Sequence, residues 1–172
     1  MEPLPKVGCR DIYRAPLVSF IMKEKRFAID ERVRWSDVDR AGIIYFGSYI
    51  RFFEIAETEL YRAMGLPYSH AFEELDVYPV RAQFHSDFKA PAFLDDLLTT
   101  KLWVHHLGTS SIELHFEIVR KLSEKETPGE VLVTGHCVLV TVRRTTLRPC
   151  RIPDRLRSGL EEYHISGNSE EV

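Results

Sequence analysis

The chain has 172 residues, 44% of them hydrophobic, which is enough for one domain with a closed core. Its 23 basic and 26 acidic residues give a net charge of −3, a balance that argues against a nucleic-acid-binding protein. The three cysteines, Cys9, Cys137 and Cys150, are widely spaced. This pattern indicates reduced thiols in a cytoplasmic protein rather than a disulfide framework or a zinc site.

The first part of the chain carries no functional signal. Its apolar run, Ala15–Met22, is too short to span a bilayer. The run also lacks the preceding basic region and the small-residue cleavage site of a signal peptide. We therefore expect residues 1–24 to form a loosely ordered N-terminal extension, residues 25–165 to form the domain, and residues 166–172 to form a C-terminal tail.

Hydrophobic periodicity then predicts a strand followed by a long helix. Arg26–Trp35 alternates apolar and charged side chains, which is typical of a half-buried strand. After a loop, a helix is expected to begin near Gly47. Apolar residues over Tyr49–Met64 recur at three- and four-residue spacing and make one wide face, with Glu54 and Glu57 away from it.

Gly65 and Pro67 are expected to end this helix, and a short second helix is possible at Ser69–Leu75. The period then changes to two over Val80–Phe88, where alternate residues are expected on opposite faces of a strand. Three further strands are predicted at Asp96–Leu107, Ser110–Leu122 and Val131–Thr145. The last strand is apolar on both faces and is placed in the middle of the sheet. A terminal helix is expected at Asp154–Tyr163.

This order of elements predicts an α+β fold. The long helix has more apolar surface than a loop can cover. An antiparallel sheet of about five strands is therefore expected to wrap around it.

The loop before the long helix places two aspartates at the edge of the expected core, in the sequence SDVDRAGIIYFGSY. A calcium loop starting at Asp37 would need ligands at its fifth and twelfth positions, which here are Ala41 and Ser48, so we reject it. Short polar residues favour turns and helix starts, and Asp37 is interpreted in that way. Asp39 could instead act on a carbonyl whose oxyanion is held by the free N–H groups at the helix start.

A resemblance favours the chemical role for Asp39. The segment DVDRAGIIYFGSYIRFFEIAETE, residues 37–59, resembles the signature of hotdog-fold acyl-CoA thioesterases of the 4-hydroxybenzoyl-CoA thioesterase family. SDFKAPAFLDD, residues 86–96, and LRPCRIPD, residues 147–154, are similar to two further segments of that family. The resemblance implies a hotdog fold, in which the sheet wraps a long central helix.

The resemblance also implies which residues form the site. Asp39 matches the family's catalytic carboxylate. The backbone N–H of Phe46 matches the donor that polarises the thioester carbonyl, and Gly47 could supply a second donor. Many small bacterial members have a histidine where this chain has Phe46, which argues against a route that needs an imidazole there. The hydroxybenzoyl branch also lacks that histidine, so the resemblance leaves catalysis by Asp39 and the helix start alone open. Tyr49 is interpreted as a core residue.

Other candidate groups are given structural roles. Glu54 and Glu57 lie one helical turn apart and are interpreted as solvated or interface residues, with a secondary catalytic role left open. Cys137 lies within a buried strand and is interpreted as a small core residue.

The histidines are also assigned no site. His105 and His106 are adjacent on a strand and are expected on opposite faces, while His85, His115 and His136 lie on different strands, so no metal site is predicted. No redox or metal cofactor is implied either. Because the sequence has no glycine-rich phosphate loop, the coenzyme A tail would need surface cations. Five are available near strand ends, and none is assigned individually: Lys89, Arg143, Arg144, Arg148 and Arg151.

The sequence therefore predicts hydrolysis of an acyl-CoA thioester at a homodimer interface, with two dimers often forming a tetramer. Asp39 would be the nucleophile or the general base. The alternatives are a non-catalytic acyl-CoA-binding hotdog domain and a hydrolase of acyl groups on acyl carrier protein. A hotdog hydratase is disfavoured because its Asp–His dyad is missing. Neither a nucleic-acid partner nor a membrane span is expected.

Overall fold

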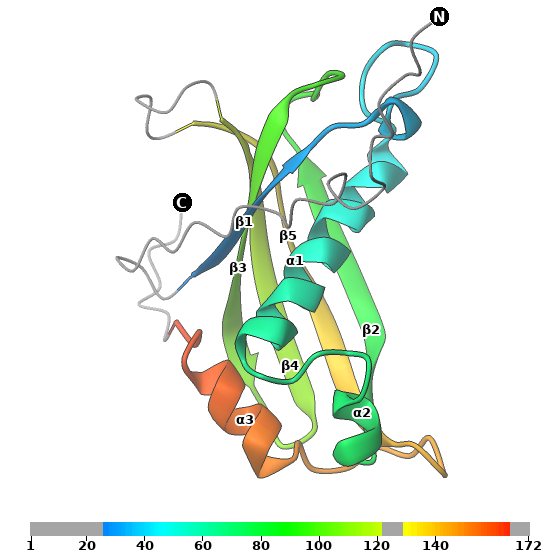
Figure 1. Cartoon of the computed structure of the whole chain (residues 1–172), viewed down its shortest axis with the longest axis vertical. Coiled ribbons are helices and arrows are strands. Elements are labelled where there is room, and N and C mark those ends of the chain that lie inside the picture. Colours follow the sequence, from blue (N-terminus) through cyan, green and yellow to red (C-terminus); the bar gives the residue numbers. More distant parts are fainter. Residues whose placement is uncertain (1–25, 122–128, 166–172) are drawn as a thin grey trace, which may run out of the picture.

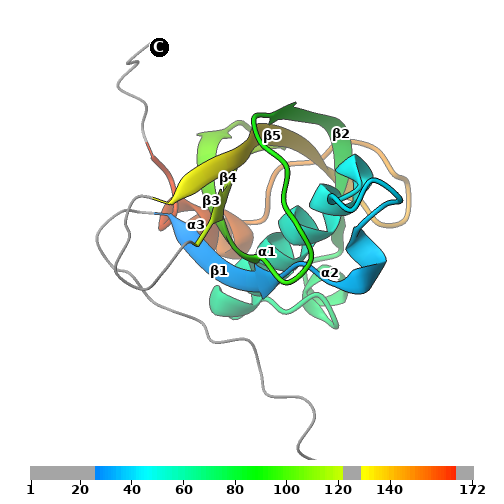
Figure 2. The ribbon, with the colours of Figure 1, turned by 90° about the horizontal axis from the view of Figure 1, so that it is seen from above.

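The computed structural model describes residues 26–121 and 129–165. Five antiparallel strands form one sheet in the order β1-β3-β4-β5-β2. Their bounds are β1 Phe27–Arg32, β2 Val77–Phe88, β3 Leu97–Leu107, β4 Ser111–Arg120 and β5 Glu130–Arg143. The sheet curves around the long helix α1, Tyr49–Ala63, which lies along its concave face (Figures 1 and 2). The predicted α+β hotdog architecture is confirmed.

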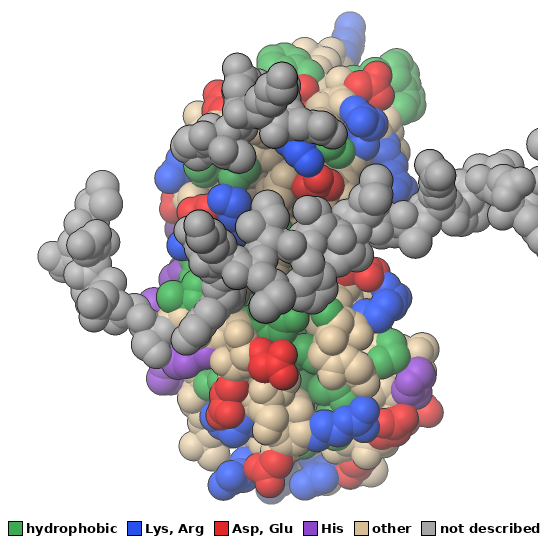
Figure 3. Space-filling view, turned by 60° about the vertical axis from the view of Figure 1, so that its left-hand side comes forward, with side chains coloured by type: hydrophobic (Ala, Val, Ile, Leu, Met, Phe, Trp, Pro, Cys, Tyr) green, Lys and Arg blue, Asp and Glu red, His purple; other side chains and the backbone are tan. Residues whose placement is uncertain are grey.

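Two short helices flank this unit (Figure 1). Helix α2, Ala71–Glu74, precedes β2, and helix α3, Asp154–Glu161, follows β5. No helix in the described part of the chain is long and apolar enough to cross a membrane. On the face drawn in Figure 3, basic and acidic side chains are interspersed. The predicted extensions at residues 1–24 and 166–172 lie outside the described residues.

Helix α1 ends as its sequence predicts. Gly65 has a φ of +70°, a conformation that favours glycine. The Gly65 N–H donates to the Arg62 carbonyl at 3.0 Å, and the Leu66 N–H donates to the Tyr61 carbonyl at 2.9 Å. These two bonds form a Schellman motif, which satisfies carbonyls that the helix leaves open.

The core lies between α1 and the sheet. Residues Phe52, Phe53 and Leu60 of α1 are fully buried, as are alternate residues of β4 from Ile112 to Ile118. Cys137 is buried as predicted, and desolvation raises the pKa of its thiol to about 11. Cys137 therefore stays protonated near neutral pH and is a packing residue.

The first strand is shorter than predicted. It ends at Arg32, and a 3-10 helix, Trp35–Asp37, follows it. The Asp37 carboxylate accepts the Arg34 N–H at 2.8 Å and so fixes this turn. Because the Asp37 side chain stabilises this turn, residues 33–35 do not continue the strand that the sequence predicted.

The predicted alternation of the strand Val80–Phe88 is wrong at its start. A bulge between Arg81 and Gln83 shifts the register against β5. Arg81 therefore reaches toward α1, on the same side as Phe84, which packs on Phe53 with ring centroids 5.4 Å apart. β5 is an interior strand as predicted, although β4 is the central strand.

Candidate active site

Asp39 lies in a tight hairpin just before α1. Its N–H donates to the Ile43 carbonyl at 2.9 Å, and its carbonyl accepts the Gly42 N–H at 3.0 Å. Gly42 has a φ of +78°, which this turn requires. One carboxylate oxygen of Asp39 accepts the Ala41 N–H at 2.7 Å, and the side chain is exposed. Asp39 is thus oriented by its own turn, and its second oxygen has no partner among the described residues.

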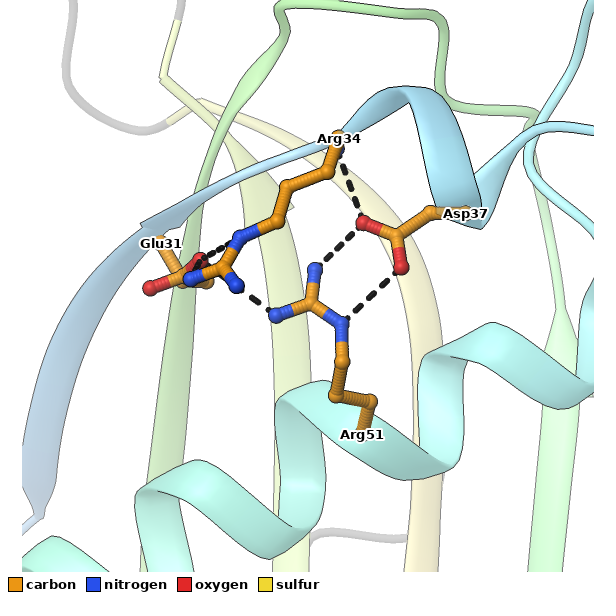
Figure 4. Close-up of polar contacts among 4 residues, drawn as sticks. All are labelled: Glu31, Arg34, Asp37 and Arg51. Atoms are coloured by element: carbon orange, nitrogen blue, oxygen red, sulfur yellow. Dashed lines mark hydrogen bonds and ion pairs between the residues drawn. The ribbon is translucent and has the colours of Figure 1, made fainter.

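Asp37 has the opposite environment. It is 3% exposed, and both carboxylate oxygens are bound by the Arg51 guanidinium from α1 (Figure 4). The distance from Arg51 Nε to Asp37 Oδ1 is 2.9 Å. Arg51 also contacts Glu31 at 3.3 Å. Asp37 caps a turn as predicted, but it also ties the loop to the helix, which the sequence analysis missed because Arg51 lies far along the chain.

The start of the helix leaves two backbone donors open. Phe46–Ser48 forms one 3-10 turn that leads into α1. The Ser48 N–H donates to the Tyr45 carbonyl at 2.8 Å, and the Tyr49 N–H donates back to Phe46 and Gly47. Phe46 and Gly47 donate no backbone hydrogen bond within the described part of the chain. First-turn N–H groups carry the positive end of the helix dipole and suit an oxyanion.

A pocket of about 300 Å³ opens beside these donors. It is lined by Ile43, Ile44, Phe46, Tyr49 and the segment 88–91. The Ile44 N–H donates to the Ala92 carbonyl at 2.9 Å, which holds this segment against the Asp39 hairpin. The segment was noted in the sequence for its family likeness, but its lining residues were not predicted. The sequence feature that could have indicated them is the aromatic residue and proline of SDFKAPAF, Phe88 and Pro91, which both line the pocket.

Tyr49 closes the inner side of this pocket. It is 4% exposed, as expected of a core residue, and its hydroxyl oxygen accepts the Ala92 N–H at 3.2 Å. Desolvation raises the Tyr49 pKa, so the hydroxyl stays neutral near pH 7. Lys89 lies at the pocket and is exposed, so it is a cation that could meet a phosphate.

The two helix glutamates differ from each other. Glu54 is exposed, as expected, whereas Glu57 is 1% exposed and pairs with Arg81 of β2. The interpretation of Glu57 as a solvated residue is therefore wrong, because the bulge in β2 brings a guanidinium to it. Glu57 lies eleven residues after Phe46, about 16 Å along the helix axis. Neither glutamate lines the pocket.

The pocket opens onto an apolar surface. Tyr45, Phe46, Phe88 and Phe93 are 49%, 62%, 52% and 47% exposed, respectively. The rings of Phe46 and Phe88 lie 6.4 Å apart, and those of Tyr45 and Phe46 lie 4.6 Å apart. The contiguous rings of Tyr45, Phe46 and Phe88 are exposed, as is typical of a surface that binds a ligand or another chain.

Comparison with known proteins identifies the class. The model of the thioesterase-like superfamily matches residues 33–160, and the chain belongs to this superfamily. The acyl-CoA thioester hydrolase YbgC of Escherichia coli is 30% identical over 102 residues, which are 59% of this chain and 75% of that protein. The 1,4-dihydroxy-2-naphthoyl-CoA hydrolase of Acaryochloris marina is 29% identical over 139 residues, 78% of this chain and 95% of that protein.

Solved structures share the fold. A Staphylococcus aureus hypothetical protein in complex with CoA has a TM-score of 0.72 and 16% identity. The match covers 84% of this chain and 87% of that chain. The predicted class, a thioesterase with the hotdog fold, is therefore confirmed.

Proposed function

We propose that this thioesterase hydrolyses an acyl-CoA, with Asp39 as the catalytic carboxylate and the N–H groups of Phe46 and Gly47 as the oxyanion hole. The observation that carries the proposal is the pair of open N–H groups beside an apolar pocket, with Asp39 on the adjoining hairpin. Ile43 links the two parts, because its carbonyl accepts the Asp39 N–H and its side chain lines the pocket.

The acyl group would occupy the pocket, with its carbonyl oxygen toward Phe46 and Gly47. Asp39 then attacks the carbonyl carbon, or takes a proton from a water that attacks it. The oxyanion forms at the helix start, where prepositioned donors stabilise it. The carbon–sulfur bond breaks, coenzyme A leaves as a thiol, and the acid is released after water has supplied its hydroxyl.

Coenzyme A as the carrier is supported by the named relatives, which are an acyl-CoA thioester hydrolase and a 1,4-dihydroxy-2-naphthoyl-CoA hydrolase. A structural neighbour also holds CoA. Lys89 at the pocket is the cation we assign to the phosphates of this substrate. No metal takes part in the proposed steps.

We propose that the site works in a homodimer, which can pair further into a tetramer. The exposed aromatic side chains at the pocket mouth would be covered by a second chain. β2 is an edge strand of 12 residues, and Tyr78 and Val80 on it are exposed. Such an edge pairs readily with another strand. The cytoplasmic location remains a prediction.

The test is thiol release from a panel of aromatic, short-chain and long-chain acyl-CoAs, with matched acyl carrier protein substrates in parallel. Steady release of coenzyme A from at least one acyl-CoA is expected. Binding of the panel without turnover would favour the non-catalytic alternative. Turnover of the carrier-protein substrates alone would favour the second alternative.

A further inference from the structure

Four histidines form a row across the face of the sheet that points away from α1. In β4, Ile112, Leu114 and Phe116 are buried against the helix, so Glu113 and His115 lie on the opposite face. His115 is directly opposite His136 of β5, and His136 is opposite His85 of β2.

The ring contacts follow this register. The centroids of His115 and His136 are 5.6 Å apart, and those of His85 and His136 are 5.3 Å apart. His105 of β3 completes the row, because its ring stacks on His115 with centroids 4.1 Å apart. None of these side chains belongs to the pocket at the helix start.

A bulge in β3 brings His105 to this position. The pairing with β4 shifts between Val104 and His106, so His105 is the extra residue. His105 and His106 are both exposed, and the strict alternation expected for them does not hold here. The prediction of no metal site weighed His105 only together with His106, whereas the sheet sets His105 beside His115 of β4.

Glu113 adds a carboxylate to the two imidazoles. Its Oε1 lies 2.8 Å from His115 Nε2. One ligand atom from each of His105, Glu113 and His115 lies within 4.8 Å of the other two. Among the described residues, this is the group of three potential ligands that can approach one cation.

We propose that His105, Glu113 and His115 bind a divalent transition-metal ion of the zinc class. Two imidazoles and a carboxylate are a ligand set that zinc accepts, with metal–ligand distances of about 2.0–2.2 Å. Ligand atoms around such an ion lie roughly 3.3 Å apart. Glu113 Oε1 and His115 Nε2, 2.8 Å apart, are somewhat closer than that and need only a small separation to admit the ion, and His105 is exposed at their side.

Binding replaces the proton between His115 Nε2 and Glu113 Oε1 with the metal, and that proton is released to water. Water completes the coordination shell. His136 of β5 lies beside His115, with ring centroids 5.6 Å apart. The site ties the β3 bulge to β4 on the face opposite α1, so its effect is on stability rather than on the thioesterase reaction.

The experiment titrates the metal-free full chain with Zn²⁺ alone, by calorimetry. One ion per chain is expected. Changing groups that only orient ligands costs about 10–100-fold in metal affinity, so His105→Ala, Glu113→Gln and His115→Ala should each weaken binding by about a hundredfold. His70→Ala is the control, because His70 is an exposed histidine that contacts only Ser69 among the described side chains.

Melting without zinc verifies that each variant folds, and the wild-type chain and His70→Ala should melt at higher temperature with zinc. X-ray absorption at the zinc edge should show two imidazole ligands in the wild-type complex. The proposal is overturned if no ion binds, if the three cluster variants bind as the wild type does, or if His70→Ala weakens binding equally. Thiol release should be the same with and without zinc, so the outcome is independent of the proposed function.

Discussion

Asp37 and Asp39 are separated by one residue, and their carboxylates differ in every contact that sets reactivity. Asp37 is enclosed by Arg51 and by the Arg34 N–H (Figure 4). Its charge is compensated, as a buried carboxylate requires. The Asp39 side chain is exposed, and among the described residues its carboxylate accepts one hydrogen bond, from the Ala41 N–H. A carboxylate with one oxygen open to solvent can attack a carbonyl carbon or accept a proton. Both oxygens of Asp37 are instead bound by Arg51, so its role is structural.

Asp37→Asn is expected to destabilise the protein. The amide can still accept the Arg34 N–H, but Arg51 loses one of its two carboxylate partners. Removing one partner from a fully buried ion pair costs about 3–5 kcal/mol. Arg51 is 27% exposed and keeps Glu31, so we expect a loss of about 2 kcal/mol in the free energy of unfolding, measured in urea. A change below about 0.5 kcal/mol, typical of a surface substitution, would contradict this role.

At the scale of the elements, the start of α1 supplies the proposed oxyanion donors. Phe46→Pro removes one N–H without removing the helix, because proline is tolerated at the first helical position. Tyr45 already has a φ of −65° and a ψ of 131°, which suits a residue before proline. Losing one such donor is expected to lower kcat by about 10²–10³-fold in steady-state thiol release.

Phe46→Ala is the matched control, because it shortens the same side chain but keeps the N–H. We expect it to retain kcat within about tenfold and to change KM, since the ring lines the pocket. Equal losses of kcat in the two variants would assign the effect to the ring and not to the backbone donor.

The contact between Glu57 of α1 and Arg81 of β2 is expected to make the free energy of unfolding depend on pH. Burial raises the pKa of Glu57, although Arg81 and the Tyr68 hydroxyl lower it. The folded chain therefore keeps a proton on Glu57 at pH values where the unfolded chain has released it. This contribution to stability is complete below the ordinary glutamate pKa of 4.5 and is lost as the pH rises through the raised value.

Glu57→Gln cannot ionise, so it removes this dependence. The wild-type protein should lose stability relative to Glu57→Gln as the pH rises from the ordinary glutamate pKa of 4.5 through the raised value, as measured by urea unfolding at each pH. Glu54→Gln is the control, because Glu54 is exposed on the same helix. A stability difference between the wild type and Glu57→Gln that is constant with pH would contradict the burial effect.

Elements whose limits are set locally were predictable from the sequence. The end of α1 at Gly65 follows from one residue with a positive φ. The features that were missed depend on strands far along the chain. The bulges that place Arg81 against Glu57 and His105 against His115 leave no mark in a local hydrophobic pattern. The proposed site residues, Asp39, Phe46 and Gly47, come from a motif within one loop and helix start, so naming them required no knowledge of how distant strands pair.

The proposed active site requires a second copy of the chain. Val80→Lys places a charge on the exposed edge of β2, a substitution that discourages pairing between edges. We expect the wild type to sediment as a dimer or tetramer at micromolar concentration. The variant should shift toward monomer and lose thiol release in parallel. A folded monomer with full activity would contradict the interface model.

Asp39 is proposed to perform the chemistry, and Asp39→Asn, assayed with the best acyl-CoA of the panel, tests that role. The substitution keeps shape and the contact to Ala41 but removes the charge that attacks or accepts a proton. We predict that kcat for thiol release falls by about a hundredfold or more. KM and the melting temperature should stay close to those of the wild type. A well-folded Asp39→Asn protein that turns over near the wild-type rate would contradict the account.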